Sequence, residues 1–191
     1  MAATTSISRW HLREAVRALD AGGIIAYPTE AVYGLGCDPL DRPAVLRLLR
    51  LKQRPVSKGL IVIAASLEQL RPYLGPLTPA VSRRIRATWP GPVTWVVPAR
   101  PETPWWLRGA HAGIAVRVTA HPLAAALCTA AGRALVSTSA NVASRPPART
   151  ALRVRLAFGD EIDCIVHGPT GGQGRPTEIR SATGGMVLRA G

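Results

Sequence analysis

The stretch LKQRPVSKGLIVIAA, residues 51–65, combines the end of a helix, a basic loop and a buried strand. Upstream of it, Asp41 is a suitable helix cap, Pro43 suits the first turn, and apolar residues follow at helical spacing. Pro55 disfavours helical backbone at the residue before it, so the helix must end within this stretch. The run GLIVIAA at residues 59–65 is short and apolar, which is typical of a buried strand. A helix followed directly by a buried strand favours an α/β fold.

The same alternation extends over most of the chain. The expected helices cover residues 8–21, 41–54, a short segment after 66, 78–89, 121–132 and 150–157. The expected strands cover residues 23–28, 59–65, 93–99, 113–118, 134–141, 163–168, 177–181 and 185–191, and residues 28–39 are expected to form a loop. The last two strands follow each other closely, which indicates a mixed sheet. We therefore predict one α/β domain with a mixed sheet, residues 8–191, behind a flexible N-terminus at residues 1–7.

The charge of the chain is strongly positive. It has 24 Lys+Arg against 11 Asp+Glu, a formal net charge of +13. Only two of these cations are lysines, Lys52 and Lys58, and both fall in the quoted stretch. No acidic residue occurs between Glu102 and Asp160, a span that contains seven arginines. Such a balance favours binding of polyanions or of phosphorylated small molecules.

Several classes of site and location are disfavoured by what the chain lacks. Its 3 cysteines and 4 histidines form no close pairs, which argues against a disulfide framework and against a metal site made by the protein. The segment HGPTGGQGRPTE lacks the GK[ST] ending of a P-loop, its GGQ tripeptide alone does not indicate a release factor, and no GxSxG elbow is present. No apolar run is long enough for a membrane span, and the N-terminus lacks a secretory signal, so we expect a cytoplasmic protein.

Polar residues gather in loops at the ends of the expected strands, where ligands collect in open α/β sheets. Lys52, Arg54 and Lys58 form either an anion site or a solvated helix end. In PTEAVYGLG, the hydroxyls of Thr29 and Tyr33 either face a ligand or belong to a tight turn with the tyrosine in the core. The sequence leaves both pairs of alternatives open.

Two further segments carry the same ambiguity. In STSAN, Ser139 and Asn141 follow a buried strand and either bind a ligand or cap the next turn. Arg117 interrupts the apolar alternation of AGIAVRV. If its side chain points inward it needs an anionic partner, and the absence of acids nearby in the sequence suggests a ligand carboxylate or phosphate. The alternative is an outward-facing arginine on an edge strand.

Six segments, taken in order, resemble one known family. They are YPTEAVYGLGCDP, LKQRPVSKGLIVIAASLEQL, WPGPVTWVVPA, AVRVTAHPL, LVSTSANVASRPPART and TEIRSATGGMVLRAG. Together they are similar to the YrdC-like threonylcarbamoyl-AMP synthases, in the short bacterial form called TsaC, from about residue 8 to the end. The resemblance implies a twisted mixed sheet flanked by helices, with a basic concave groove.

The resemblance also implies an activity and a set of site residues. L-threonine, bicarbonate and ATP would condense to threonylcarbamoyl-adenylate and pyrophosphate, and Mg²⁺ would arrive with the phosphates of ATP. Downstream threonylcarbamoyl-transferase proteins would then modify the adenosine beside the anticodon of tRNA, with contact between this chain and tRNA an open question. The KxR…SxN signature, implied to be catalytic, falls on Lys52, Arg54, Ser139 and Asn141. The implied threonine and ATP pocket contains Thr29, Tyr33, Lys58, Arg117, Thr150, Thr177 and Arg189.

The chain departs from the family pattern at three places. Ala31 stands where longer relatives have a second threonine, so one substrate contact is missing or replaced. The usual SANxSG reads SANVAS, with Ala143-Ser144, so a glycine turn is expected to be lost. Ser181 stands in place of the usual Asp.

Two rival functions are weighed against this one. A non-enzymatic RNA-binding module, such as a ribosome or rRNA factor, fits the charge of +13, but the chain has few aromatic residues for base stacking. A hydrogenase-maturation carbamoyltransferase would need the larger chain that surrounds its YrdC-like domain.

Overall fold

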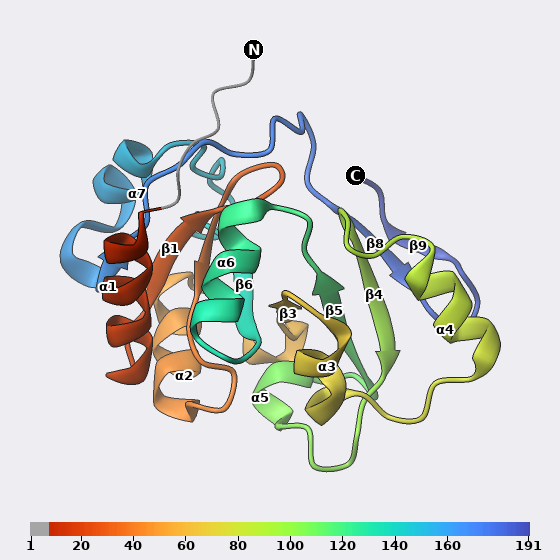
Figure 1. Ribbon diagram of the computed structural model, residues 1–191. Helices are drawn as coiled ribbons and strands as arrows, with labels where there is room; N and C mark the ends of the chain where they lie inside the picture. The colour runs from red at the N-terminus through yellow and green to blue at the C-terminus, as the bar shows by residue number, and fades with distance from the viewer. Residues whose placement is uncertain (1–7) are drawn as a thin grey trace.

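A nine-stranded mixed sheet forms the centre of the computed structural model, which describes residues 8–191 (Figure 1). The strands are β1 Ile25–Pro28, β2 Tyr33–Gly36, β3 Ile61–Ala64, β4 Val93–Pro98, β5 Gly113–Val118, β6 Leu135–Ser139, β7 Cys164–Ile165, β8 Glu178–Ser181 and β9 Val187–Arg189. The α-helices are α1 Arg9–Asp20, α2 Arg42–Leu51, α3 Leu67–Leu70, α4 Pro79–Arg86, α5 Trp105–Arg108, α6 Pro122–Ala130 and α7 Ala151–Phe158. The predicted α/β class and mixed sheet are confirmed, whereas the predicted flexible segment 1–7 lies outside the described residues.

The strand order is β7-β1-β2-β6-β3-β5-β4-β8-β9. The pairs β1–β7, β3–β5 and β4–β8 are parallel, and the remaining neighbours are antiparallel. The last two strands, β8 and β9, pair antiparallel. Within the described part of the chain, no helix has the length and hydropathy needed to cross a membrane.

The assignment of residues 28–39 to a loop is wrong, because this segment contains β2. Its glycines hide the strand pattern in the sequence, since glycine in a strand interior supplies no side chain to alternate. In the structure Gly36 pairs with Ile25 of β1, and an added Cβ at Gly36 would overlap the carbonyl oxygen of Val136 in β6. The glycine therefore allows the close approach of a neighbouring strand.

Two apolar clusters lie on opposite faces of the sheet. Alternation along β1 separates them, because Ala26 belongs to one cluster while Ile25 and Tyr27 belong to the other. Buried residues of α1 and α6 cover the face of Ile25 and Tyr27, and α2 and α7 contribute to the opposite cluster. In Figure 1, α1 and α6 lie over one half of the sheet, away from β4, β8 and β9.

The pairing of β3, β4, β5 and β6 shows which part of the sheet α1 and α6 leave uncovered. Ile61 of β3 pairs with both Ala115 of β5 and Ser137 of β6, and Ala115 pairs with Val96 of β4. Because paired residues share a face, these four side chains lie on the face that α1 and α6 cover elsewhere. That open part of the sheet forms the floor of the pocket described next.

Candidate functional site

A pocket of about 540 Å³ lies on the uncovered part of the sheet. Strands β2, β3, β4, β5, β6, β8 and β9 all contribute lining residues, together with the loop after α2 and the segment after α5. The basic lining residues are Arg54, Lys58, Arg108, Arg117 and Arg189. No Asp or Glu is among the lining residues in the part of the chain that the structure describes. The pocket is therefore suited to an anionic ligand.

The loop after α2 is folded around Arg54. Its guanidinium donates through Nη2 to the carbonyl oxygen of Gly59 at 2.9 Å and through Nε to the same oxygen at 3.3 Å. Gly59 has φ of 62°, a left-handed conformation that glycine adopts at low cost. Burial lowers the pKa of Arg54, and the side chain lines the pocket beside Lys58. The two hydrogen bonds to Gly59 hold the Arg54 guanidinium in place at the pocket wall.

Lys52 points into the protein and is only 4% exposed. Its Nζ donates to the carbonyl oxygen of Ser139 and, at 2.7 Å, to that of Asn141. Its own carbonyl oxygen accepts from the N–H of Ala143 at 3.0 Å. Lys52 thus joins the end of α2 to the turn after β6. It is not among the residues that line the pocket.

Burial lowers the pKa of Lys52 to about 8, and the positive charge of Arg54 lowers it further in the same direction. Because the ordinary value is 10.5, the folded protein loses this proton as pH rises above about 8 while the unfolded chain retains it. The unfolded state then binds more protons, so this lysine makes stability rise with pH.

We expect the stability advantage of wild type over a Lys52→Met variant to grow by roughly 1–2 kcal/mol between pH 7 and pH 9.5. Urea unfolding of both proteins at the two pH values measures it. Taking the difference cancels the titration of the buried tyrosines and cysteines, which the two proteins share. A difference that stays constant or shrinks with pH contradicts the assigned environment of this amine.

Ser139 and Asn141 form a closed turn at the end of β6. The Ser139 hydroxyl donates to Oδ1 of Asn141 at 2.6 Å, and Nδ2 of Asn141 donates to the carbonyl oxygens of Val142 at 3.0 Å and Arg145 at 2.8 Å. Both residues also line the pocket. The two roles that the sequence leaves open, capping a turn and facing a ligand, are thus compatible.

The glycine turn expected to be lost after Asn141 is present in the structure. Ser144 adopts φ of 66°, the left-handed conformation that a glycine would take at low cost. A non-glycine residue there carries backbone strain. We therefore expect Ser144→Gly to raise the free energy of unfolding by about 1 kcal/mol, measured by urea denaturation. Gly132→Ala, at φ of 66° with open space around its Cβ position, is the reverse control and should lose a similar amount. A neutral or destabilising Ser144→Gly would contradict the strained turn.

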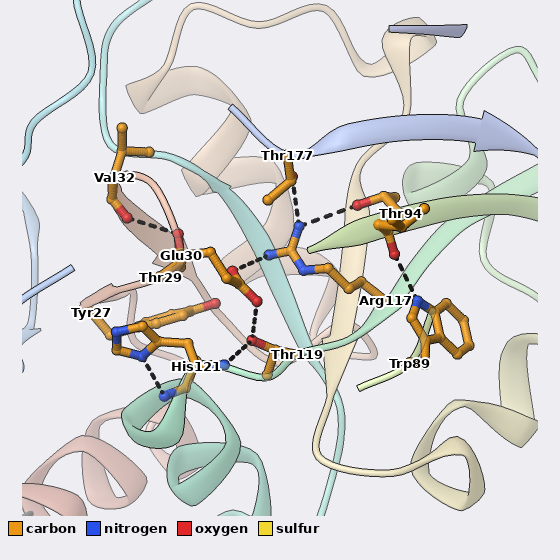
Figure 2. A network of polar contacts seen from close by, with 12 residues as sticks. Tyr27, Thr29, Glu30, Val32, Trp89, Thr94, Arg117, Thr119, His121 and Thr177 are labelled. Atoms are coloured by element: carbon orange, nitrogen blue, oxygen red, sulfur yellow. Dashed lines mark hydrogen bonds and ion pairs between the residues drawn. The ribbon is translucent and has the colours of Figure 1, made fainter. Parts of the chain in front are cut away.

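Arg117 of β5 is 3% exposed and lies at the side of the pocket. Figure 2 shows its guanidinium between Glu30 on one side and Thr94 and Thr177 on the other. Nη2 lies 3.3 Å from Oε2 of Glu30, and Nη1 donates to the hydroxyl oxygens of Thr177 at 2.8 Å and Thr94 at 3.2 Å. The side chain points inward, as one of the two interpretations requires. Its charge partner, however, is the carboxylate of Glu30, which corrects the expectation that a ligand carboxylate or phosphate is that partner.

Three guanidinium groups lie close together at the pocket. Burial lowers the pKa of Arg189, and the positive charges of Arg117 and Arg54 lower it further. Nη2 of Arg189 donates to the carbonyl oxygen of Thr177 at 2.6 Å. Like charges held this close are stabilised when an anion binds between them. Of these three arginines, only Arg117 appears among the ion pairs of the described residues, with Glu30 as its carboxylate partner.

The remaining predicted residues divide between the pocket and structural contacts. Thr29 lines the pocket, but its hydroxyl donates to the carbonyl oxygen of Val32 at 2.7 Å and closes the β1–β2 turn. The Tyr33 hydroxyl donates to the carbonyl oxygen of Gly168 at 2.7 Å, and burial raises its pKa. Thr150 lies outside the pocket and caps α7, where its hydroxyl accepts from the N–H of Arg153.

Sequence reasoning missed some residues of the site and its surroundings. Glu30 lies in the quoted PTEAVYGLG segment, but only the fold brings it to Arg117. Arg108 and His111 line the pocket without any motif that marks them. Ala31, a departure from the family pattern, also lines the pocket, so the position of the missing threonine does face the ligand space. No group of three or more potential metal ligands occurs within residues 8–191.

Comparison with known proteins places this geometry in a family. The model of the Sua5/YciO/YrdC family, whose description reads "Telomere recombination", matches residues 17–191. The chain belongs to the Sua5/YciO/YrdC family. Among curated Sua5/YciO/YrdC relatives, a threonylcarbamoyl-AMP synthase of Nitrosococcus oceani is 56% identical over 180 residues, which cover 94% of this chain and 97% of the relative.

Solved Sua5/YciO/YrdC structures share the fold. P. abyssi Sua5 complexed with L-threonine is 33% identical with a TM-score of 0.89, over 95% of this chain and 54% of that one. The present chain thus spans about half the length of that Sua5 protein. E. coli YciO is 28% identical with a TM-score of 0.83, over 95% of this chain and 89% of that one.

Proposed function

We propose that the protein is a threonylcarbamoyl-AMP synthase, a nucleotidyltransferase that condenses L-threonine, bicarbonate and ATP to threonylcarbamoyl-adenylate and pyrophosphate. The observation that carries the proposal is the clustering of Arg54, Arg117 and Arg189 around a pocket that offers no acidic lining side chain in the described chain. ATP, bicarbonate and the threonine carboxylate are all anionic. The curated relatives of nearly equal length carry the same name.

The chemistry needs positioning and charge neutralisation rather than a protein nucleophile. The unprotonated amine of threonine adds to the carbon of bicarbonate, and loss of water leaves a carbamate. A carbamate oxygen then bonds to the α-phosphorus of ATP while the bond from that phosphorus to the pyrophosphate oxygen breaks. Negative charge moves onto the leaving pyrophosphate, which fixed cations stabilise.

Each group of residues takes one part in this reaction. Arg54, Lys58 and Arg189 neutralise phosphate oxygens, and Arg117 with Thr177 holds the carboxylate end of threonine. Ser139 and Asn141 line the pocket beside threonine and the nucleotide, with the Ser139 hydroxyl oxygen able to accept a hydrogen bond, and Lys52 holds their turn in place. Thr29 and Tyr33 shape the wall beside them. Any Mg²⁺ enters on the phosphates of ATP, since no lining Asp or Glu of the described chain offers a ligand.

The product serves downstream threonylcarbamoyl-transferase proteins that modify the adenosine beside the anticodon of tRNA, and we place this work in the cytoplasm. Contact of this chain with tRNA itself stays a prediction. Steep salt dependence of RNA binding, with no turnover of ATP, would favour the rival RNA-binding function.

The test is pyrophosphate release from ATP by the purified protein, with threonine and bicarbonate omitted in turn. We expect release that requires both, with threonylcarbamoyl-adenylate detected by mass spectrometry. Arg153→Gln on the exposed face of α7 is a matched charge control outside the pocket and should retain wild-type release. Release that is indifferent to threonine would rule out the proposed reaction.

A further inference from the structure

Glu30 is a buried carboxylate at the edge of the pocket. It lies in the turn between β1 and β2, is 5% exposed, and is not among the lining residues. Its backbone carbonyl oxygen accepts from the N–H of Gln173 at 3.1 Å, so the turn itself is tied to the segment before β8. A buried charge of this kind is costly unless it is paired. The contacts of the Glu30 carboxylate therefore indicate what role this buried charge has.

Two side chains hold the two oxygens of this carboxylate. Oε1 accepts from the hydroxyl of Thr119 at 2.6 Å, and Oε2 lies 3.3 Å from Nη2 of Arg117 (Figure 2). The backbone N–H of His121 donates to the Thr119 hydroxyl oxygen at 3.2 Å, which leaves the Thr119 hydrogen directed at Glu30. The carboxylate is thus fixed in orientation by the start of α6 and presents Oε2 to the arginine.

The contact with Glu30 decides where the rest of the arginine points. With Nη2 facing Oε2, Nη1 is directed to the hydroxyl oxygens of Thr177 and Thr94. The Thr177 oxygen accepts from Arg117 at 2.8 Å, so its own hydrogen is free to donate to another acceptor. Arg117 and Thr177 both line the pocket, whereas Glu30 does not. Glu30 thus contacts Arg117, Arg117 donates to the Thr177 hydroxyl oxygen, and Thr177 lines the pocket.

We propose that Glu30 is a positioning residue for substrate binding: through Arg117 it orients the Thr177 hydroxyl as a donor toward the carboxylate of L-threonine. The proposal rests on the proposed function and adds a residue that touches no substrate. Because Arg117 is already paired, it acts on the substrate partly through the polarised Thr177 hydroxyl rather than as an unpaired charge. Glu30 therefore affects the threonine end of the pocket more than the nucleotide end.

The test compares Glu30→Gln and Thr119→Val with wild type in steady-state pyrophosphate release, varying threonine and ATP separately. Glu30→Gln removes the negative charge that faces Arg117 and leaves a single acceptor oxygen, so the guanidinium is no longer held with Nη1 directed at Thr177. We expect the KM for threonine to rise about tenfold and the KM for ATP to change less than about twofold. Thr119→Val keeps both charges but removes the hydroxyl that orients the carboxylate and accepts from the N–H of His121, so the KM for threonine should rise about threefold.

A matched control separates positioning from general loosening. Asp163→Asn weakens a different ion pair, 2.8 Å from Arg47 and outside the pocket, and should leave both KM values unchanged. A folded Glu30→Gln with a wild-type threonine KM, or with equal rises for threonine and ATP, overturns the proposal. If Glu30→Gln does not fold, Thr119→Val decides by the same criterion.

Failure of the proposed function is recognised separately. Wild-type release that does not depend on threonine refutes the synthase activity whatever the variants do. Calorimetric titration of L-threonine then tests the positioning role without turnover. Binding that is weakened about tenfold in Glu30→Gln supports the role of Glu30. Equal binding by both proteins, or no binding by either, refutes it.

Discussion

Lys52→Met is expected to lower the rate of pyrophosphate release by roughly 10²–10³ at saturating substrates. In the structure the ammonium donates to the carbonyl oxygens of Ser139 and Asn141. Its loss removes a positive charge next to the pocket and releases the turn that presents both side chains. Displacement of such positioning groups by about 1 Å is enough to cost on the order of 10² in rate.

The same contacts indicate a loss of stability in this variant. Two carbonyl oxygens lose their donor, and an unsatisfied buried acceptor costs about 1–3 kcal/mol. Folding of Lys52→Met therefore has to be verified by circular dichroism at the assay temperature before the rates are compared.

Two companion variants sharpen the experiment. Lys52→Arg should recover little activity, because a planar guanidinium does not fit between two carbonyl oxygens that hold a compact ammonium. Lys58→Met, at an exposed position on the pocket rim, should mainly raise the KM for ATP. Turnover by folded Lys52→Met close to that of wild type would refute the role given to this lysine.

The parts of the fold that can be predicted from the sequence are those determined by local sequence patterns. Helix α2 begins after Asp41, whose carboxylate accepts from the N–H of Ala44, and it ends at Leu51 before Pro55. Strand β3 follows, as the apolar run predicts. Capping, proline geometry and alternation act over a few residues, so a single sequence reveals them.

Contacts between distant segments explain what the sequence does not reveal. Gly36 makes β2 look like a loop, and the reason for this glycine is the backbone of β6. Neighbouring sequence positions do not predict the charge partner of Arg117, because Glu30 lies in another turn and only the fold brings it close. The family resemblance implies a catalytic role for Lys52, and only the packing of α2 against the turn after β6 shows that its side chain points inward, away from the pocket lining. The residue types of the site are thus predictable, and their mutual orientation is not.

Most of the cations at the site are oriented by the same kind of contact. Arg54, Lys52 and Arg189 are each held by backbone carbonyl oxygens rather than by carboxylates. Carbonyl oxygens fix a cation in place without neutralising its full charge, so the charge stays available to an anionic ligand. Arg117 is the exception, because it is paired with the buried carboxylate of Glu30.

Arg117→Met is expected to lower the free energy of unfolding by about 3–5 kcal/mol, because it leaves the Glu30 carboxylate buried without its cation. The hydroxyl oxygens of Thr94 and Thr177 lose a donor at the same time. Urea denaturation followed by circular dichroism measures the loss.

The double variant Glu30→Met/Arg117→Met tests the cause. Replacing both members of a buried ion pair by apolar side chains of similar volume is often close to neutral, so the double variant should regain most of the lost stability. Threonine-dependent turnover should stay low in it, since the group that orients Thr177 is gone. Additive losses in the double variant would show instead that each side chain stabilises the fold independently, and that the two charges are not held here as a pair.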